Sequence, residues 1–285
     1  MEITETNVKS ILTRTTGFLE TVTSHSLQPY RGCSYGNSLC GVGCYVQHSY
    51  WVTKGRLWGS FLEVRTNAAE AYRRQYERER KWAREKRDGF SIFMSSATDP
   101  FVPQEQKYRI SESVFTAMSE QVPDALILQT HSHRVVDYLD VLSTIDCDLR
   151  VHLSIETDRE SIDGLPRHAS SVSDRFESAA RLKAAGVNVV ITVAPLLPIE
   201  DPESFFERIS ECASSVVIDH FIEGDGSSGG SRTLKTRLPE AIESIEPDAV
   251  DLSYRDRMVE VAEAIMPGRV GVNIDGFSGR YSKRG

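Results

Sequence analysis

The chain has 285 residues, a length that fits one large domain or two smaller ones. Its 33 Lys and Arg and 41 Asp and Glu give a net charge of −8, and 40% of the residues are hydrophobic. This composition excludes collagen-like, intrinsically disordered and membrane-embedded proteins, and it indicates a globular chain.

The amino terminus, Met1 to Thr6, has neither the basic start nor the apolar stretch of a secretory signal, and no run of about 18 apolar residues occurs. We therefore expect a cytoplasmic protein with no membrane partner. Five cysteines, an odd number, are expected in such a compartment to be ligands, reactive thiols or core residues rather than a disulfide framework.

Basic residues gather in one stretch of the chain. Residues 54–87 carry eleven Lys or Arg and five Glu, a net charge of +6 against a total of −8, which leaves −14 for the rest. A basic stripe of this kind could contact nucleic acid. Within it, however, residues 68–87 have the apolar spacing of a helix, with Arg and Glu alternating as i, i+4 partners. We therefore favour a solvated helix face.

Short apolar runs alternate with amphipathic stretches along the chain, which predicts strands and helices in turn. In chain order we expect a strand at 61–65, a helix at 68–87, a strand at 91–95, a helix at 111–121, a strand at 125–129, a helix at 135–144, a strand at 151–155, a helix at 173–185, a strand at 188–194, a helix at 203–213, and strands at 216–222 and 270–274.

This alternation predicts parallel βαβ units, because parallel neighbours need a crossover that a helix supplies. Such units form either a barrel or an open sheet with helices on both faces, and periodicity alone does not choose between them. In both architectures ligands bind at the carboxyl ends of the strands. Chemistry is therefore expected at those ends.

The most informative segment holds three cysteines within twelve residues, Cys33, Cys40 and Cys44, in the spacing C-x6-C-x3-C. Glycines between them let the backbone bend tightly, so the three thiolates can converge. Soft thiolates at short spacing select zinc, copper(I) or an iron–sulfur cluster. A structural zinc site needs a fourth ligand, for which His48 is the candidate. A four-iron cluster on three thiolates would instead leave one iron open to a small chelating molecule.

Further short motifs follow at the ends of the expected strands. They are LEVRTN at 62–67, SSATDPFVP at 95–103, LILQTHS at 126–132, LSIET at 153–157, PR at 166–167 and APLLP at 194–198. Together with PYRGC at 29–33, which enters the cysteine loop, they resemble in order and spacing the radical S-adenosylmethionine (SAM) enzymes related to spore photoproduct lyase. The resemblance covers roughly residues 27–222.

The resemblance implies an α/β fold with a partial TIM-type (β/α)6 barrel, the radical SAM core, at residues 27–222. A segment at 1–26 would precede this core, and a C-terminal loop and extension at 223–285 would follow it. The resemblance further implies a [4Fe-4S] cluster on Cys33, Cys40 and Cys44, with SAM binding the fourth iron. Reductive cleavage of SAM would then yield a 5′-deoxyadenosyl radical.

By the same resemblance, the SAM contacts fall at or shortly after strand ends. The matching positions are Ser96, Thr98, Asp99, His131, Ser154, Glu156, Arg167, Pro195 and Leu196. Arg167 suits the methionine carboxylate, because a planar guanidinium binds carboxylates bidentately. Each position also has a structural interpretation. Ser96 and Thr98 can cap a turn, Glu156 can be a solvated carboxylate, and Arg167 can pair with Asp163.

The chain departs from the family pattern at three points. The usual cysteine spacing is C-x3-C-x2-C with an aromatic residue before the third cysteine, where this chain has Gly43. His131 stands where relatives often have a lysine. Spore photoproduct lyase also carries a hydrogen-donating cysteine in the segment that matches residues 95–99, and its absence here argues against repair of thymine lesions.

A Gly-rich stretch at 224–231 matches a dinucleotide-binding pattern only weakly, and we interpret it as a mobile loop over the strand ends that could close over substrate. The leading hypothesis is a radical SAM enzyme of the lyase or oxidoreductase type, reduced by a flavodoxin or ferredoxin, with a small molecule, a peptide or a nucleic acid as substrate. Two alternatives stay open. One is a non-catalytic zinc- or iron–sulfur-binding module, and the other is a lyase that repairs or modifies nucleic acid.

Overall fold

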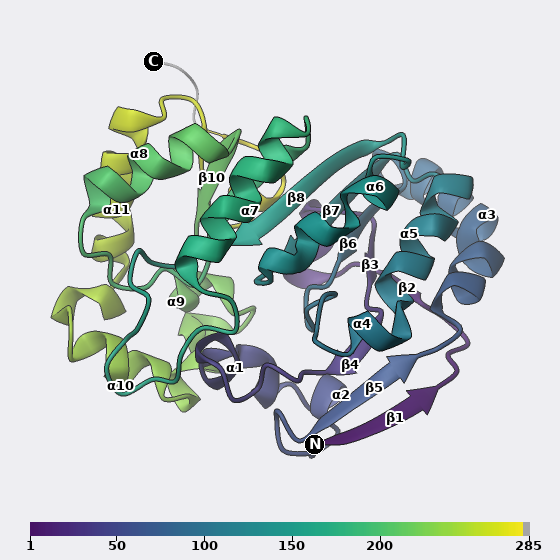
Figure 1. The fold of residues 1–285 in the computed structure, drawn as a ribbon, viewed down its shortest axis with the longest axis horizontal. Coiled ribbons are helices and arrows are strands. Elements are labelled where there is room, and N and C mark those ends of the chain that lie inside the picture. Colours follow the sequence, from purple (N-terminus) through teal and green to yellow (C-terminus); the bar gives the residue numbers. More distant parts are fainter. Residues whose placement is uncertain (282–285) are drawn as a thin grey trace.

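A computed structural model describes residues 1–281 and has an eight-stranded sheet at its centre, ordered β11-β10-β9-β8-β7-β6-β3-β2 (Figure 1). Neighbouring strands are parallel, except that β2 runs antiparallel to β3. The strands are β2 (Leu12–Arg14), β3 (His25–Leu27), β6 (Ser91–Met94), β7 (Ala125–Thr130), β8 (Asp148–Ser154), β9 (Asn188–Val193), β10 (Ser215–Ile218) and β11 (Val270–Val272).

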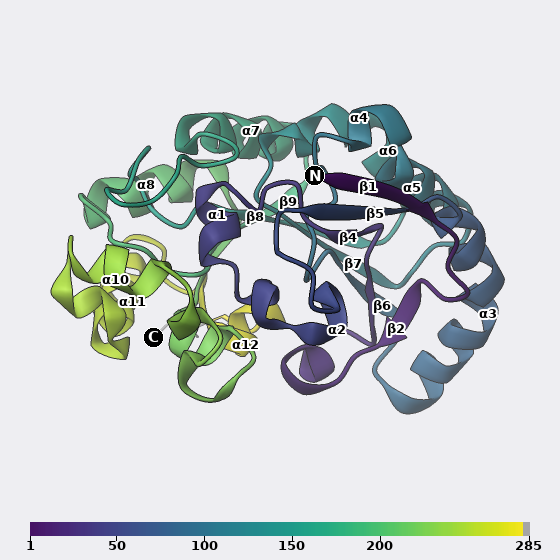
Figure 2. The same cartoon turned by 90° about the horizontal axis from the view of Figure 1, so that it is seen from below.

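A second, three-stranded sheet carries the start of the chain. In it β5 (Phe61–Arg65) lies between β1 (Glu2–Thr6), which is parallel to it, and β4 (Tyr30–Gly32), which is antiparallel. Figure 2 shows β1 and β5 side by side along their length. The expected strand at 61–65 therefore exists, but it belongs to this small sheet, which holds the entrance to the cysteine loop.

Five long helices connect and cover the strands: α3 (Ala68–Lys86), α5 (Ile110–Glu120), α7 (Val172–Ala184), α8 (Pro202–Cys212) and α11 (Leu252–Ile265). The shorter α-helices are α1 (Leu39–Gly43), α2 (Tyr50–Thr53), α4 (Glu105–Tyr108), α6 (Leu139–Leu142), α9 (Phe221–Gly224), α10 (Leu238–Glu243) and α12 (Asn273–Phe277). Single 3-10 turns are η1 (Gly17–Thr21), η2 (Tyr45–His48), η3 (His133–Tyr138), η4 (Ser228–Gly230), η5 (Thr233–Lys235) and η6 (Pro247–Val250).

The two faces of the main sheet face different surroundings, because successive side chains on a strand point to opposite faces. Ile92 and Met94 of β6 belong to the large core that the sheet forms with the long helices. Phe93, between them, packs on the other face with side chains of β7, β9, β10 and α12. Figure 2 shows α3, α5 and α7 on one side and α1 and α2 on the other. This one-sided cover confirms the partial barrel that the resemblance implied.

The open side of the partial barrel is bridged by aromatic side chains. Phe18 of η1 lies in the connection between β2 and β3 at one sheet edge, and Phe277 of α12 follows β11 at the other edge. Their rings meet edge to face at 5.8 Å between centroids. Phe277 also packs 6.4 Å from Phe93, on the inner face of the sheet. Both segments outside residues 27–222 thus join the barrel, although residues 282–285 lie outside the described part of the chain.

The expected elements hold for most of the barrel and are wrong at three places. The strand expected at 216–222 ends at Ile218, because Asp219 and His220 turn the chain into α9, where the His220 ring accepts a hydrogen bond from the Ile222 amide (3.2 Å). The strand expected at 270–274 ends at Val272, since Asn273 adopts a left-handed conformation (φ 50°) that starts α12. The helix expected at 135–144 is a 3-10 turn followed by the short α6.

The basic helix α3 has carboxylates beside its arginines. Arg73 pairs with Glu120 at 2.7 Å, and Arg84 pairs with Asp124 at 3.0 Å. These ion pairs agree with a solvated helix face. Among residues 1–281, no helix has the length and apolar character needed to cross a membrane.

Candidate active site

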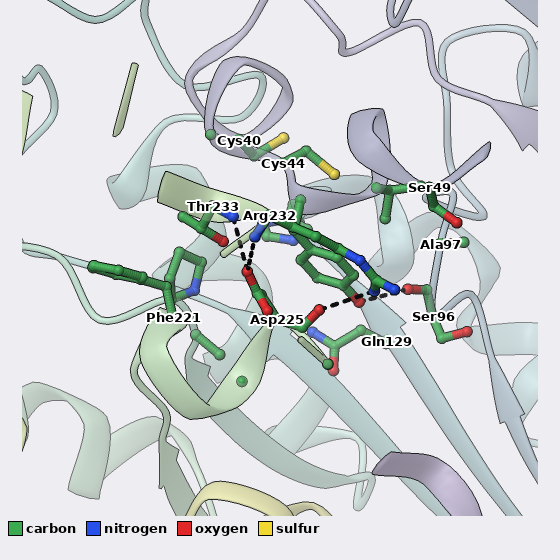
Figure 3. A pocket seen from close by; sticks show the side chains of 18 of the residues that line it. Cys40, Cys44, Ser49, Ser96, Ala97, Gln129, Phe221, Asp225, Arg232 and Thr233 are labelled. Carbon is green, nitrogen blue, oxygen red and sulfur yellow. Dashed lines mark hydrogen bonds between the residues drawn. The ribbon is translucent and has the colours of Figure 1, made fainter. Parts of the chain in front are cut away.

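A cavity of about 590 Å³ lies at the carboxyl ends of the parallel strands, on the inner face of the sheet. Most of its wall comes from three parts of the chain: the cysteine loop with the residues that follow it up to Trp58, the strand ends, and the segment after β10. Residues of η1 and Phe277 of α12 complete the wall. Figure 3 shows Cys40 and Cys44 on one side, Gln129 on the opposite side and Arg232 between them. The sequence-predicted residues that line it are Cys33, Cys40, Cys44, Ser96, Thr98, Asp99, His131, Glu156 and Pro195.

The cysteine loop reaches the cavity through two close backbone approaches. Cys33 follows β4 directly after Gly32, whose φ of 83° and contact with the Phe61 carbonyl oxygen leave no room for a Cβ atom. At Gly41, inside α1, a Cβ atom would collide with the Tyr35 carbonyl oxygen. These glycines let the loop fold back on itself, which brings all three cysteines to one cavity.

Cys33 is buried, and Cys40 and Cys44 are half-buried. Burial raises the pKa of Cys40 to about 12 and that of Cys44 to about 11. For Cys33, burial and the charges of the other two cysteines raise the pKa well above its ordinary value. Neutral thiols are therefore the stable state of this wall, and a bound metal would have to displace their protons.

The donor set fits an iron–sulfur cluster better than a single ion. Across residues 1–281, no three or more His, Cys, Asp or Glu side chains lie close enough together to hold one metal ion. The thiolates of a four-iron cluster each bind a different iron, so they need not converge on one point. His48, the alternative zinc ligand, is exposed and does not line the cavity. Three soft thiols on one wall therefore match the cluster that the resemblance implied.

Asp99 and His131 connect the ends of β6 and β7. The Asp99 carboxylate accepts hydrogen bonds from the His131 amide (2.8 Å), the Phe101 amide (2.8 Å) and the Thr130 hydroxyl (2.9 Å). Burial raises the pKa of Asp99, although His131 and these hydrogen bonds oppose the rise. With all these donors supplied by the protein, Asp99 fixes the loop that carries Ser96 and Thr98.

Glu156 lies at the end of β8, bound on both sides. Its Oε1 is 2.6 Å from His131 Nδ1, and its Oε2 accepts a 2.6 Å hydrogen bond from Arg175 of α7. Burial alone would raise the pKa of Glu156, but the charges of Arg175 and His131 outweigh burial and hold that pKa well below its ordinary value. Glu156 is thus a buried carboxylate ion that orients the His131 ring.

Sequence reasoning missed Arg175, which is the largest fully buried side chain of the described residues. It also donates to the Ser154 carbonyl oxygen at 2.6 Å, and its Nη2 lies 3.0 Å from His168 Nδ1. A signal was present in the sequence. Arg175 shares the apolar face of α7 with Ala179 and Leu182, and a charged residue on such a face needs a buried partner.

Five polar atoms of residues that line the cavity have no hydrogen-bond partner in residues 1–281: Trp58 Nε1, Ser95 Oγ, Thr98 Oγ1, Gln129 Oε1 and Asp219 Oδ1. Buried polar atoms are nearly always paired, so five open ones around one cavity indicate a ligand site. Burial raises the pKa of Asp219 to about 7, with Arg255 partly opposing. Sequence analysis missed Asp219, because the strand expected at 216–222 placed this residue inside a strand, whereas β10 ends at Ile218.

The structure does not bring three predicted site residues to the cavity. Ser154 is buried beside it, bonded to Gln129 Nε2 (2.7 Å) and to Thr192 Oγ1 (3.0 Å). Leu196 is fully buried in the main core, and its neighbour Leu197 lines the cavity instead. Arg167 is exposed, and its carbonyl oxygen accepts a 3.0 Å hydrogen bond from the Leu39 amide at the start of α1.

The segment from Phe221 to Leu238, which we call the cover segment, forms the third wall. Its backbone is organised by Asp225, whose carboxylate accepts from the amides of Ser227 (2.8 Å), Arg232 (3.1 Å) and Thr233 (2.8 Å). Arg232 Nη1 donates to the Asp225 carbonyl oxygen at 3.2 Å, and within residues 1–281 its guanidinium forms no ion pair. The Gly-rich stretch is thus an organised part of the wall, and it places Arg232 in the cavity (Figure 3).

Comparison with family models and with curated proteins finds no match for the chain. Among solved structures, the fold is similar to that of a tyrosine-to-phenylalanine mutant of spore photoproduct lyase, with a TM-score of 0.65 and 16% identity over 95% of this chain and 81% of that chain. A cysteine-to-alanine mutant with dinucleoside spore photoproduct gives 0.63 and 15% over 95% and 80%. A double mutant with bound AdoMet and dinucleoside spore photoproduct gives 0.61 and 16% over 95% and 81%. These likenesses show that the chain has the fold of spore photoproduct lyase, as its motifs predicted.

Proposed function

We propose that the protein is a radical SAM enzyme that abstracts hydrogen from a substrate still to be identified. One observation carries the proposal: three thiols of one loop and five unpartnered polar atoms, most of them at strand ends, belong to residues that line the same cavity. A neighbour of the same fold binds AdoMet, which adds support. A [4Fe-4S] cluster on the three cysteines would supply one electron to the SAM sulfonium, whose S–C5′ bond then breaks to give methionine and a 5′-deoxyadenosyl radical.

Cys33, Cys40 and Cys44 would hold the cluster, and the strand ends would hold SAM. Thr98 Oγ1, which has no partner in residues 1–281, would accept a hydrogen bond from the SAM amino group, and Ser96 also lines the cavity. The His131 ring contacts Glu156 through Nδ1. Its other nitrogen, Nε2, would therefore be available to bind the SAM carboxylate.

The remaining predicted residues would act through these contacts. We assign Pro195 to the wall beside the adenine, whereas Asp99, Ser154, Glu156 and Leu196 would position the strand ends from within the protein. Arg167 would support α1 through its backbone, and we propose no SAM contact for its exposed side chain.

Anaerobic reconstitution with iron and sulfide tests the proposal. We expect iron and acid-labile sulfide in near-equal amounts, visible absorption, and 5′-deoxyadenosine once dithionite and SAM are added. Cys33→Ala, Cys40→Ala and Cys44→Ala should each abolish deoxyadenosine formation. Cys147→Ala is the matched control, because Cys147 packs against the main core away from the cavity wall.

Two outcomes would contradict the proposal. One is deoxyadenosine formation that survives all three cavity substitutions. The other is a protein that binds a single zinc ion, loses it on His48→Ala and forms no deoxyadenosine, which would support the metal-binding module instead.

A further inference from the structure

Apolar side chains are unusually exposed in one short surface segment. Tyr50, Trp51 and Leu57 are 68%, 82% and 78% exposed, and they lie within eight residues of one another. We call residues 50–57 the aromatic turn. Large apolar side chains that gather on a surface mark interaction sites, whereas isolated ones do not.

The aromatic turn is held in a fixed shape. Arg31 donates from Nε to the Val52 carbonyl oxygen (2.8 Å) and from Nη2 to the Trp51 carbonyl oxygen (3.2 Å). Lys54 lies over the Trp51 ring, with Nζ 4.9 Å from the ring centroid. A surface that is ordered before its partner arrives loses little conformational entropy on binding.

The inner side of the aromatic turn touches the cysteine wall. Val52 and Trp58 belong to the same apolar cluster as Cys33 and Cys44, and both line the cavity. The exposed residues Trp51 and Leu57 are therefore direct chain neighbours of side chains that pack with these cysteines. Electron tunnelling falls off exponentially with distance, so a donor bound at this turn would be at short range.

The aromatic turn itself carries two cations, Lys54 and Arg56, and no carboxylate. No Asp or Glu occurs between Glu20 and Glu63, whereas the whole chain has a net charge of −8. Arg31 and Arg56 both pair with the carboxylate of Glu63, so these three side chains together carry a net charge of +1. Lys54 adds a second positive charge to the aromatic turn. Charge complementarity steers association, and a positive patch of this kind attracts a negatively charged partner.

We propose that the aromatic turn is the docking site of an acidic electron-transfer protein such as a flavodoxin or ferredoxin. The inference rests on the proposed function, because it assumes a cluster on the three cysteines. In each encounter the reduced donor would lose one electron and the cluster would gain it, with no proton or other group transferred. Nucleic acid is a less suitable partner, since its affinity comes from several phosphate-neutralising cations, and this patch centres on apolar side chains.

The test compares Lys54→Glu and Trp51→Ala with wild type, using the reconstituted protein and an acidic flavodoxin. Both substitutions change exposed side chains, so the fold should be kept. We expect flavodoxin binding at low salt, measured by calorimetry, to weaken about tenfold or more in each variant. Deoxyadenosine formation driven by reduced flavodoxin should fall equally, whereas formation driven by dithionite should not change.

Lys107→Glu is the matched control, because Lys107 also lies over an aromatic ring, that of Tyr108, at 4.8 Å. Equal binding by wild type and both variants would overturn the docking site. So would variants that lose binding of a short single-stranded DNA and keep flavodoxin-driven reduction. If wild type forms no deoxyadenosine with dithionite, the proposed function is wrong. The calorimetric measurement would still show whether flavodoxin binds at the aromatic turn.

Discussion

At the scale of single residues, the cavity wall depends on a buried charge pair. Glu156 and Arg175 have side chains that are 2% and 1% exposed, and they meet at 2.6 Å. Removing one partner of such a pair leaves the other charge buried without compensation. Since Glu156 also orients His131, the pair connects the stability of the barrel to the geometry of its site.

We therefore expect Arg175→Ala to lower the free energy of unfolding by about 3–5 kcal/mol, measured by urea denaturation. Arg73→Ala is the control, because Arg73 pairs with Glu120 on the surface and surface pairs contribute little. An Arg175→Ala protein as stable as the control would show that Glu156 does not depend on this partner.

The burial of His152 affects how the stability of the folded protein changes with acid. Its ring is fully buried on β8, between Phe93 and Phe277, and in residues 1–281 neither ring nitrogen has a hydrogen-bond partner. Burial lowers the pKa of His152 from 6.5 to about 3. As the pH falls below 6.5, the unfolded chain binds a proton that the folded chain does not, so stability decreases down to about pH 3.

His152→Phe keeps an aromatic ring at this place and removes both unpaired nitrogens. We expect the melting temperature to rise at neutral pH and the gain to grow between pH 6.5 and pH 4, measured by thermal unfolding at a series of pH values. A gain that is the same at every pH, or a loss, would contradict this account.

At the scale of elements, the cover segment shows how one carboxylate organises a wall with little regular structure. Asp225 is 1% exposed and bonds the backbone on both sides of the Gly-rich turn η4. The ends of the cover segment are anchored by Phe221 and Leu238, which are 3% and 1% exposed, whereas the Gly-rich turn between them depends on such polar contacts. We expect this turn to be less stable than the barrel.

Asp225→Ala should release the cover segment and leave the barrel intact. We expect amide hydrogen exchange at Ser227, Arg232 and Thr233 to become about tenfold faster or more, whereas the amides of β7 and β8 keep their protection. Asp248→Ala serves as the control, because Asp248 pairs with Arg257 at the surface. Unchanged exchange in the cover segment would show that other contacts hold it.

The strands differ in how well the sequence predicts them. The strands β6 to β9 are apolar runs flanked by long helices, so composition and periodicity suffice to find them. The strands β2, β3 and β4 have three residues each and contain Thr, Ser, His or Arg, which leaves no periodicity to detect. These short strands form because the sheet edges offer partners, and that is tertiary information.

The site residues at strand ends and in the cysteine loop could be predicted from the sequence. The residues that reach the site through tertiary packing could not. The cysteines and the strand-end residues Asp99, His131 and Glu156 fall at positions that a parallel barrel brings together. Arg175 and Arg232 reach the site from a helix and from the cover segment, and their side-chain directions depend on contacts absent from the local sequence. For Arg167, proximity in sequence to a strand end suggested a role that its exposed side chain does not support.

At the scale of the whole molecule, the aromatic bridge across the open side of the barrel should matter for stability. Phe277 is 7% exposed and contacts Phe18, Phe93 and His152. We expect Phe277→Ala to lower the free energy of unfolding by about 3–5 kcal/mol in urea denaturation. Leu234→Ala, at a side chain that is 57% exposed, should have little effect. Equal effects of the two substitutions would mean that the bridge adds no stability.

The aromatic bridge can form only late during synthesis of the chain. Phe18 and Phe277 are 259 positions apart in the sequence, so a ribosome has synthesised α12 and everything between them before the two rings can meet. Strands β6 to β10 can pair earlier, because each joins a neighbour that has already been synthesised. Until α12 emerges, Phe277 cannot pack against Phe18 and Phe93, so the strand ends that line the cavity stay more accessible in the newborn chain than in the folded molecule.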